Sequence, residues 1–342
     1  MAAEDVNLAA SQPRQPFEPP PEADMGGPGR SLWGDAWHRL VRDKGAVACM
    51  LVIVLYALVA LGTTVYDYAS EHGLARWRPT PLAKMVDDTR RYQRPTLFSW
   101  TNLRERPWTE LLGTDWAGQS TLIRAILGVR VSLTVGLLSN LIAIPLGMVL
   151  GALAGYFGRW IDDVIVWLYS TLASIPGIIL LIAMKYAFQG VKFMGLDLTG
   201  IHGVYIALGI TSWIGTCRYV RAEVLKVREL DYVTAARAAG RGELAILLRH
   251  VLPNVMHLGI ISFSLGFVGA VSAEVILSYL NLGVAVGTPS WGTMINGARM
   301  DLDAGIWWEL TSAVAAMFFL VLALNILGDR LRDAFDPRLR TL

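Results

Sequence analysis

The chain has 342 residues, of which 54% are hydrophobic and 17% are charged, and its formal net charge is +2. A soluble domain of this length would carry more charge and would interrupt its apolar runs more often. The composition excludes an ordinary soluble protein and predicts an all-α integral membrane protein, because about 20 apolar residues suffice to cross the hydrocarbon layer. The small positive excess is explained by the membrane topology described below and indicates no nucleic-acid partner.

The chain is expected to begin with a disordered cytoplasmic tail over residues 1–44. Met1–Arg30 is polar and rich in proline, a composition that cannot form a packed core and does not match a cleavable signal peptide. A charge-free run then follows three basic residues. This order predicts a first membrane span at residues 45–66 with the N-terminus in the cytoplasm.

Residues 67–130 are expected to form a long extracytoplasmic segment. It is rich in basic residues, but at this length loop charge no longer decides orientation. Within Ser120–Arg130 the apolar residues recur at helical spacing, which predicts a short helix lying on the membrane surface. No pattern assigns a role to residues 67–112 or to the proline-rich tail.

Residues 131–328 are predicted to hold five further spans, which makes six in total. Pro145 and Pro176 should kink or interrupt two of them. Three glycines in the second span recur every four residues and should let another helix backbone approach closely: Gly147, Gly151 and Gly155. The charge-free stretches are Val131–Phe157, Val164–Met184, Gly200–Cys217, Val255–Ala273 and Leu310–Gly328.

Basic residues gather in the segments between spans that are predicted to face the cytoplasm. The two later outer loops hold little more than Lys192 and Arg299. This matches the positive-inside tendency and puts both termini in the cytoplasm, including a tail at residues 329–342. Cys49 and Cys217 are expected near that side as reduced thiols.

The segment 218–253 is predicted to be a cytoplasmic loop with two helices. Four residues share one face of the first helix by their i, i+3, i+4, i+7 spacing: Tyr232, Ala235, Ala236 and Ala239. Gly240 can adopt positive φ and end this helix, and a second helix should run from Glu243 toward Pro253, where the next span starts. Two interpretations remain open on geometry alone. The loop is either a docking element for another protein or an amphipathic helix resting on lipid.

The residues of this loop resemble the EAA signature of ABC importer permeases. The match rests on Ala235-Ala236, Gly240 and Leu252-Pro253, whereas Thr234 stands where the family has a leading Glu. The resemblance implies a coupling helix that seats in a groove of the ATPase subunit. The residues implied to make this contact are Asp231, Tyr232, Ala235, Ala236, Arg237, Gly240, Leu252 and Pro253.

Further segments are similar to permeases of the dipeptide/oligopeptide type. They are Gly113-Thr114-Asp115, Gly128–Leu133, Gly155–Gly158, Ile175-Pro176-Gly177, Leu280–Val284, Pro289–Met294, Leu327-Gly328-Asp329 and Asp336–Leu339. The resemblance implies a type I ABC importer permease fold in a bacterial inner membrane. It also implies a second homologous permease, two ATPase subunits that carry ATP and Mg, and an extracytoplasmic substrate-binding protein.

Motifs for chemistry are missing from the sequence. It contains no G-x-x-x-x-G-K-[ST] phosphate loop, no H-E-x-x-H and no G-x-S-x-G elbow, and its five histidines have no metal-ligand spacing. We therefore expect a transporter subunit without an ATPase site, without catalytic residues and without a metal or other cofactor of its own.

Three residues are candidates for the translocation pathway or for docking of a binding protein: Glu274, Trp291 and Asp115. An acid at membrane depth usually faces a cavity or a partner, but Glu274 could also be a helix-end acid exposed at the interface, which is the interpretation the sequence slightly favours. Trp307 and Trp308 are expected to anchor the last span at the membrane interface, and Lys185 is expected to reach the headgroups.

The favoured interpretation is the pore subunit of an ATP-driven importer of di- or oligopeptides. An importer of nickel chelates or sugars would share this architecture, because specificity is expected to reside in the binding protein. A secondary transporter would need paired carboxylates or broken helices at the midplane. A membrane-embedded hydrolase would need a nucleophile beside a base within the spans.

Overall fold

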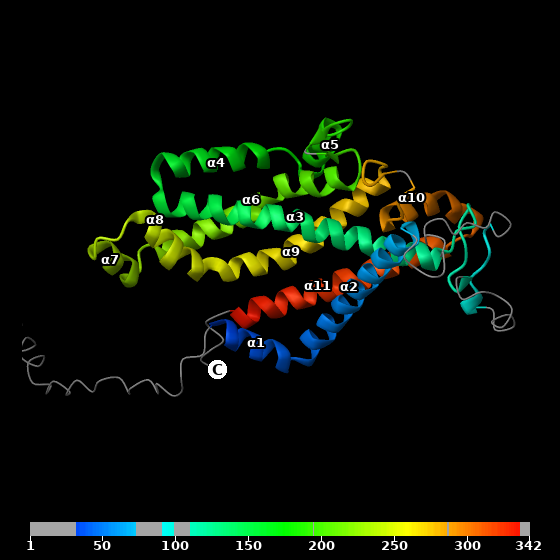
Figure 1. Ribbon diagram of the computed structural model, residues 1–342, viewed down its shortest axis with the longest axis horizontal. Helices are drawn as coiled ribbons and strands as arrows, with labels where there is room; N and C mark the ends of the chain where they lie inside the picture. Colours follow the sequence, from blue (N-terminus) through cyan, green and yellow to red (C-terminus); the bar gives the residue numbers. More distant parts are fainter. Residues whose placement is uncertain (1–31, 73–90, 99–109, 194, 286, 336–342) are drawn as a thin grey trace, which may run out of the picture.

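The computed structural model describes residues 32–72, 91–98, 110–193, 195–285 and 287–335. The predictions for the proline-rich tail, for much of the segment 67–112 and for the last seven residues lie outside these ranges. The described chain is almost entirely helical. Figure 1 shows α3, α6 and α9 side by side along the long axis, with α7 and α8 at one end of the molecule and α10 at the other. These are called the α7 end and the α10 end below.

Two helices open the described chain, α1 (Leu32–Arg42) and α2 (Lys44–Glu71). Residues 32–42 and 44, predicted as part of a disordered tail, are therefore helical, and Asp43 separates the two helices. Asp43 caps α2 by accepting hydrogen bonds from the backbone N–H groups of Gly45 (2.7 Å) and Ala46 (3.2 Å). The α1 residue Leu40 is buried, and α1 packs on the last helix, so a tertiary contact orders a segment whose composition alone suggested disorder.

The helix α3 (Thr121–Phe157) runs for 37 residues without a break. Residues 121–130, predicted as a separate surface helix, form its first turns, because Ser120 caps it at Ile123 N (3.3 Å) and no helix breaker follows before Pro145. The helix also continues through Pro145, so the predicted alternative of an interruption at this residue is wrong.

The three glycines of α3 bring it against α6 (Ile201–Val227). A Cβ atom added at Gly147 would lie 2.7 Å from the carbonyl oxygen of Trp213, and one added at Gly151 would lie 2.6 Å from that of Cys217. At Gly155 the distance to the carbonyl oxygen of Arg221 would be 2.8 Å. The predicted close approach of a second helix backbone is confirmed, and no larger residue fits along this stripe without moving α6.

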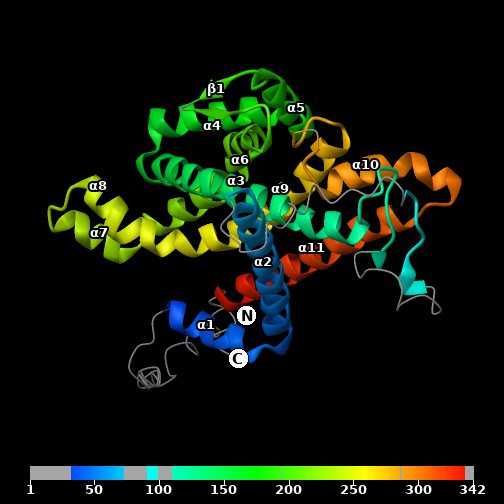
Figure 2. The same ribbon diagram turned by 45° about the vertical axis from the view of Figure 1, so that its right-hand side comes forward.

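The predicted third span is two helices, α4 (Arg159–Ala173) and α5 (Gly177–Ala187), bent by 91° relative to each other. Pro176 stands at the break, as its missing N–H and fixed φ require. Figures 1 and 2 show α4 lying along α3 and α6, while α5 turns away at its end.

An ion pair fastens α4 to α6. Arg221 donates two hydrogen bonds to Asp162, from Nε at 2.5 Å and from Nη2 at 2.7 Å, in the two-pronged geometry that favours Arg–carboxylate pairs. Both side chains are half-buried. Asp162 lies in the first turn of α4, so the pair holds the start of this helix against α6.

Replacing Asp162 with Asn should therefore destabilise the isolated subunit by about 1.5–3 kcal/mol, the usual value of a hydrogen bond to a charged group. The thermal unfolding temperature of the detergent-purified chain measures this loss. The double variant Asp162→Arg/Arg221→Asp restores the pair and should recover part of the lost stability. An unchanged unfolding temperature in Asp162→Asn would show that the pair contributes little.

A short antiparallel hairpin, β1 (Lys192–Phe193) and β2 (Leu196–Asp197), connects α5 to α6. Lys185 lies beneath it with only 2% of its surface exposed, and its ammonium group donates to the carbonyl oxygens of Thr199 (2.5 Å) and Gly200 (2.8 Å). The expectation that this lysine reaches toward lipid headgroups is wrong, because the loop carbonyls before α6 supply its partners.

The remaining helices are α7 (Asp231–Ala238), α8 (Glu243–Ile246), the π-helical turn η5 (Leu247–Val251), α9 (Leu252–Tyr279), α10 (Trp291–Asp301) and α11 (Trp308–Phe335), with the 3-10 turns η3 (Thr96–Phe98) and η6 (Leu302–Ala304). Among the described residues, four helices are long and apolar enough to cross a membrane, or five if the bent pair α4–α5 counts as one span. The helix α6 is not among them, and its sequence mixes apolar residues with His, Gly, Ser and Thr before its charged last turns. The protein is a multi-pass helical membrane protein, and the sixth predicted span is not confirmed.

Candidate functional site

The loop between α6 and α9 projects at the α7 end as a compact unit (Figures 1 and 2). Val233 is fully buried and packs with Ile246, Leu247 and Val251 against residues from α3 and α6. Tyr232, Ala235 and Ala239 point the other way and are exposed, while Ala236 is half-buried. The predicted helix and its small-residue face are therefore present, and one side of α7 is held on a hydrophobic base.

Gly240 ends α7 with a left-handed turn. Its φ is +77°, a conformation that L side chains rarely adopt. Its N–H bonds to the carbonyl oxygen of Arg237 (3.0 Å), and the next N–H, of Arg241, bonds to that of Ala236 (3.3 Å). This pair of bonds is the Schellman arrangement that satisfies the last carbonyls of a helix. The chain then enters α8 at Glu243.

Two side chains that the sequence interpretation gave no site role, Glu243 and Tyr156, hold the bend closed together with Arg237. Glu243 accepts hydrogen bonds from Arg237 across the turn, the shorter at 3.0 Å, and it also accepts one from the hydroxyl of Tyr156 at the end of α3. The hydrogen bond from Glu243 raises the pKa of the Arg237 guanidinium, with a smaller contribution from Tyr156. Opposite charges six residues apart across a glycine were the sequence signal for this contact.

The second part of the loop leads into the membrane without a break. The segments α8, η5 and α9 form one continuous helical stretch, Glu243–Tyr279. Its wide turn η5 comes just before Pro253, whose missing N–H and bulky ring disturb the regular i→i−4 pattern. Leu252 is half-buried and Pro253 is exposed. Asn254 donates to the hydroxyl of Tyr232, so α7 is tied to the start of α9.

Two of the three pathway candidates are buried together where α3, α9 and α10 meet. Glu274 has no exposed surface and accepts hydrogen bonds from Ser278 (2.7 Å) and, from α3, Ser132 (3.4 Å). It is therefore not an exposed helix-end acid. Trp291 is also fully buried and donates from Nε1 to the carbonyl oxygen of Ala125 at 2.9 Å. In this conformation both side chains are enclosed within the chain.

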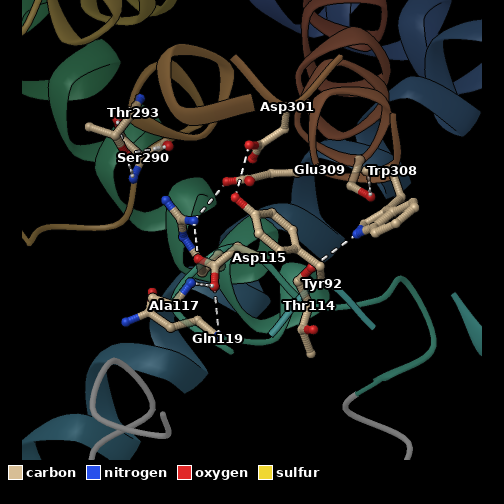
Figure 3. A network of polar contacts seen from close by, with 12 residues as sticks. Tyr92, Thr114, Asp115, Ala117, Gln119, Ser290, Thr293, Asp301, Trp308 and Glu309 are labelled. Atoms are coloured by element: carbon tan, nitrogen blue, oxygen red, sulfur yellow. Dashed lines mark hydrogen bonds and ion pairs between the residues drawn. The ribbon is translucent and has the colours of Figure 1, made fainter. Parts of the chain in front are cut away.

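Asp115 lies apart from these two, in a buried polar network at the α10 end (Figure 3). Its Oδ1 accepts the backbone N–H groups of Ala117 (2.9 Å) and Gln119 (2.7 Å), and its Oδ2 accepts from Arg124 at 2.5 Å. The same Arg124 nitrogen lies 2.7 Å from Glu309 Oε1. Asp115 thus orders the turn before α3 rather than presenting a free carboxylate.

The tryptophan pair at the start of α11 divides between two roles. Trp307 is 45% exposed, as a membrane-interface anchor would be. Trp308 is 5% exposed, and its Nε1 donates to the carbonyl oxygen of Thr114 at 3.0 Å. The prediction that Trp308 is an anchor is wrong, because the side chain is buried against the segment that contains Thr114. That segment lies 194 positions away in the sequence.

A multi-pass helical bundle with an exposed loop on a hydrophobic base is the architecture expected of the membrane part of a transport system. Residues 147–341 match the family of binding-protein-dependent transport system inner membrane components, and residues 31–93 match the N-terminal TM domain of oligopeptide transport permease C. The chain belongs to this family of inner-membrane permeases. It is thus an ABC transporter permease subunit without an ATPase site or cofactor of its own, and its system includes an ATPase and a binding protein.

Curated relatives cover nearly the whole chain. A glutathione transport system permease protein, GsiD, from Pectobacterium atrosepticum is 32% identical over 91% of this chain and 93% of its own length. A dipeptide transport system permease protein, DppC, from Bacillus subtilis is 30% identical over 92% and 88%. An oligopeptide transport system permease protein, OppC, from Haemophilus influenzae is 30% identical over 91% and 90%.

Proposed function

We propose that the chain forms half of the transmembrane pathway of an ABC importer for short peptides, with dipeptides, oligopeptides and glutathione as the substrate class. The relatives at 30–32% identity carry those three substrates in their names. All three are peptides with free charged ends, and an importer of this kind receives them from a binding protein. Nickel chelates and sugars remain the alternative cargo.

The proposed arrangement in the membrane has six spans, and the first part of α6 is the span that is not among the long apolar helices. Its first 17 residues, from Ile201 to Cys217, carry no charge, and it packs along the full length of the glycine stripe of α3. Both termini and the α7 end lie in the cytoplasm, residues 67–130 lie mainly outside, and 131–328 form the core. A second, homologous permease completes the pore, and two ATPase subunits drive it.

The exposed face of α7 is the main observation that supports coupling of the loop 218–253 to the ATPase. Tyr232, Ala235 and Ala239 leave a surface of small side chains beside one aromatic ring, on which a groove of another protein can close tightly. The other side of α7 is fixed by Val233 and by the Arg237–Glu243 pair. A helix held rigidly on one face and bare on the other can transmit force, whereas a lipid-resting helix would expose large apolar side chains.

Site-directed cross-linking tests this coupling contact. We expect Ala235→Cys to form a cross-link with cysteines around the groove of the ATPase subunit, and the cross-link yield should change when ATP closes the ATPase dimer. The control is Ala152→Cys, since Ala152 is buried against the loop base. If a lipid-phase reagent labels Ala235→Cys and no cross-link to the ATPase subunit forms, the result favours a helix that rests on the membrane.

Transport assays separate the proposed function from an ion-driven carrier. Proteoliposomes with all subunits should accumulate a labelled dipeptide only with ATP, and accumulation should stop when the phosphate-loop lysine of the ATPase is replaced. Uptake by the two permeases alone, driven by a proton or sodium gradient, would contradict the proposal.

A further inference from the structure

The polar network at the α10 end contains more acidic than basic side chains. Asp115, Asp301 and Glu309 come together from the turn before α3, from the end of α10 and from the start of α11 (Figure 3). Arg124 is shared between Asp115 and Glu309, both of which are 1% exposed. Asp301 instead accepts a hydrogen bond from the hydroxyl of Tyr92 at 2.9 Å.

Two carboxylate oxygens in this network have no partner. Within the described ranges, four buried side-chain polar atoms lack a hydrogen bond, and two of these are Asp301 Oδ2 and Glu309 Oε2. An unpaired buried carboxylate oxygen is costly, so native proteins normally supply it with a donor, an ion or a proton. Figure 3 shows both carboxyl groups on the side of the network where the Tyr92 hydroxyl lies.

Electrostatics supports the same picture at Tyr92. Burial is the largest cause that raises the pKa of its phenol, followed by the hydrogen bond to Asp301 and the negative charges of Asp301, Glu309 and Asp115. The negative charges of three carboxylates therefore all act on the Tyr92 hydroxyl. The Arg124 guanidinium balances one of these charges, and the remaining excess lies around the two unpartnered oxygens.

We propose that Asp301 Oδ2 and Glu309 Oε2 together bind a hard divalent cation, Ca²⁺ or Mg²⁺, that fastens α10 to α11. Carboxylate, carbonyl and water oxygens are the ligands that these ions prefer, and Mg²⁺ commonly takes only one or two carboxylates and keeps several waters. No described group of three or more His, Cys, Asp or Glu side chains could hold a metal ion, so the proposed site has two carboxylates, and water fills the remaining positions around the ion. The ion is structural and takes no part in the ATP-driven step.

The position of the site gives the ion a mechanical effect. Tyr92 is tied through its backbone N–H to Asp115 (3.1 Å), and Trp308 is tied to Thr114. An ion between Asp301 and Glu309 therefore joins α10 and α11 to the segment before α3. Its removal should loosen this end of the bundle and leave the α7 end unaffected.

Terbium luminescence and thermal unfolding test the site on the nucleotide-free permease–ATPase complex in lipid nanodiscs, prepared without the binding protein. Added TbCl₃ should luminesce on excitation at the tyrosine and tryptophan bands, CaCl₂ should displace it, and EDTA should lower the unfolding temperature of the complex. Asp301→Asn should weaken cation affinity by about 10- to 100-fold or more, the range seen when support for a metal site is lost.

The matched control is Asp303→Asn, an exposed carboxylate two residues from Asp301, which should bind the cation as the parent complex does. Glu309→Gln is the second site variant. If it fails to assemble, Asp301→Asn and the EDTA titration still decide the outcome. Equal terbium binding in Asp301→Asn and the parent complex would overturn the proposal. Stability that depends on pH but not on added cation would also overturn it, and would assign the two oxygens a shared proton.

Discussion

Replacing Gly151 with Leu should prevent the subunit from folding stably in the membrane. A Cβ at this position would lie 2.6 Å from the Cys217 carbonyl oxygen and 3.0 Å from Val220 Cβ, so α3 and α6 would have to separate along their whole contact. Overpacking a well-packed site costs about 1–3 kcal/mol, and here the obstacle is backbone, which cannot turn aside as a flexible side chain does. Yield and unfolding temperature of the detergent-purified chain measure the effect.

Gly215→Leu is the control for this experiment. Gly215 lies on α6, and a Cβ there meets nothing within 4 Å. Both variants add a leucine side chain, one to α3 and the other to α6. They differ in whether the two helices touch at the substituted residue. Similar yields and unfolding temperatures for the two variants would show that the glycine stripe is not what holds these helices together.

Replacing Gly240 with Val should uncouple ATP hydrolysis from transport in the assembled complex. The φ of +77° is strongly unfavourable for a β-branched residue, and such strain costs about 1–3 kcal/mol. A cost of this size corresponds to roughly a 5- to 150-fold loss of the native loop conformation. Peptide uptake should fall accordingly while the ATPase remains active, and both rates are measured in the same proteoliposomes.

Gly242→Val separates backbone strain from side-chain bulk. Gly242 has φ −65° and ψ 142°, an extended conformation that valine adopts readily, and it too has open space around its Cβ position. Near-normal coupling is therefore expected in this variant. Coupled transport in Gly240→Val, or equal losses in both variants, would mean that the bend itself does not transmit the movement.

Features that depend on neighbours close in the sequence could be predicted from it. The long apolar runs gave the helices α2, α3, α9 and α11, Pro176 gave the break between α4 and α5, and Gly240 gave the end of α7. In each case a single residue's backbone preference or a run of side-chain hydrophobicity decides the local structure.

Features that depend on distant partners could not be predicted. Lys185 and Trp308 are both typical of membrane interfaces by residue type, yet each is buried because a loop brings backbone carbonyls to its side chain. Glu274 has its partners on α3 and on its own helix. The helix α1 needed α11 to order it. Periodicity records which face of a helix is apolar, and it does not record which other segment covers that face.

The unbroken stretch from Glu243 to Tyr279 makes the two ends of the molecule mechanically one part. Its 37 residues correspond to a rod of about 55 Å at 1.5 Å per residue. Near its start Asn254 ties the rod to Tyr232, and near its other end Glu274 accepts a hydrogen bond from Ser132 of α3. A tilt of this stretch at the loop would therefore also move its Tyr279 end, because no break separates the two.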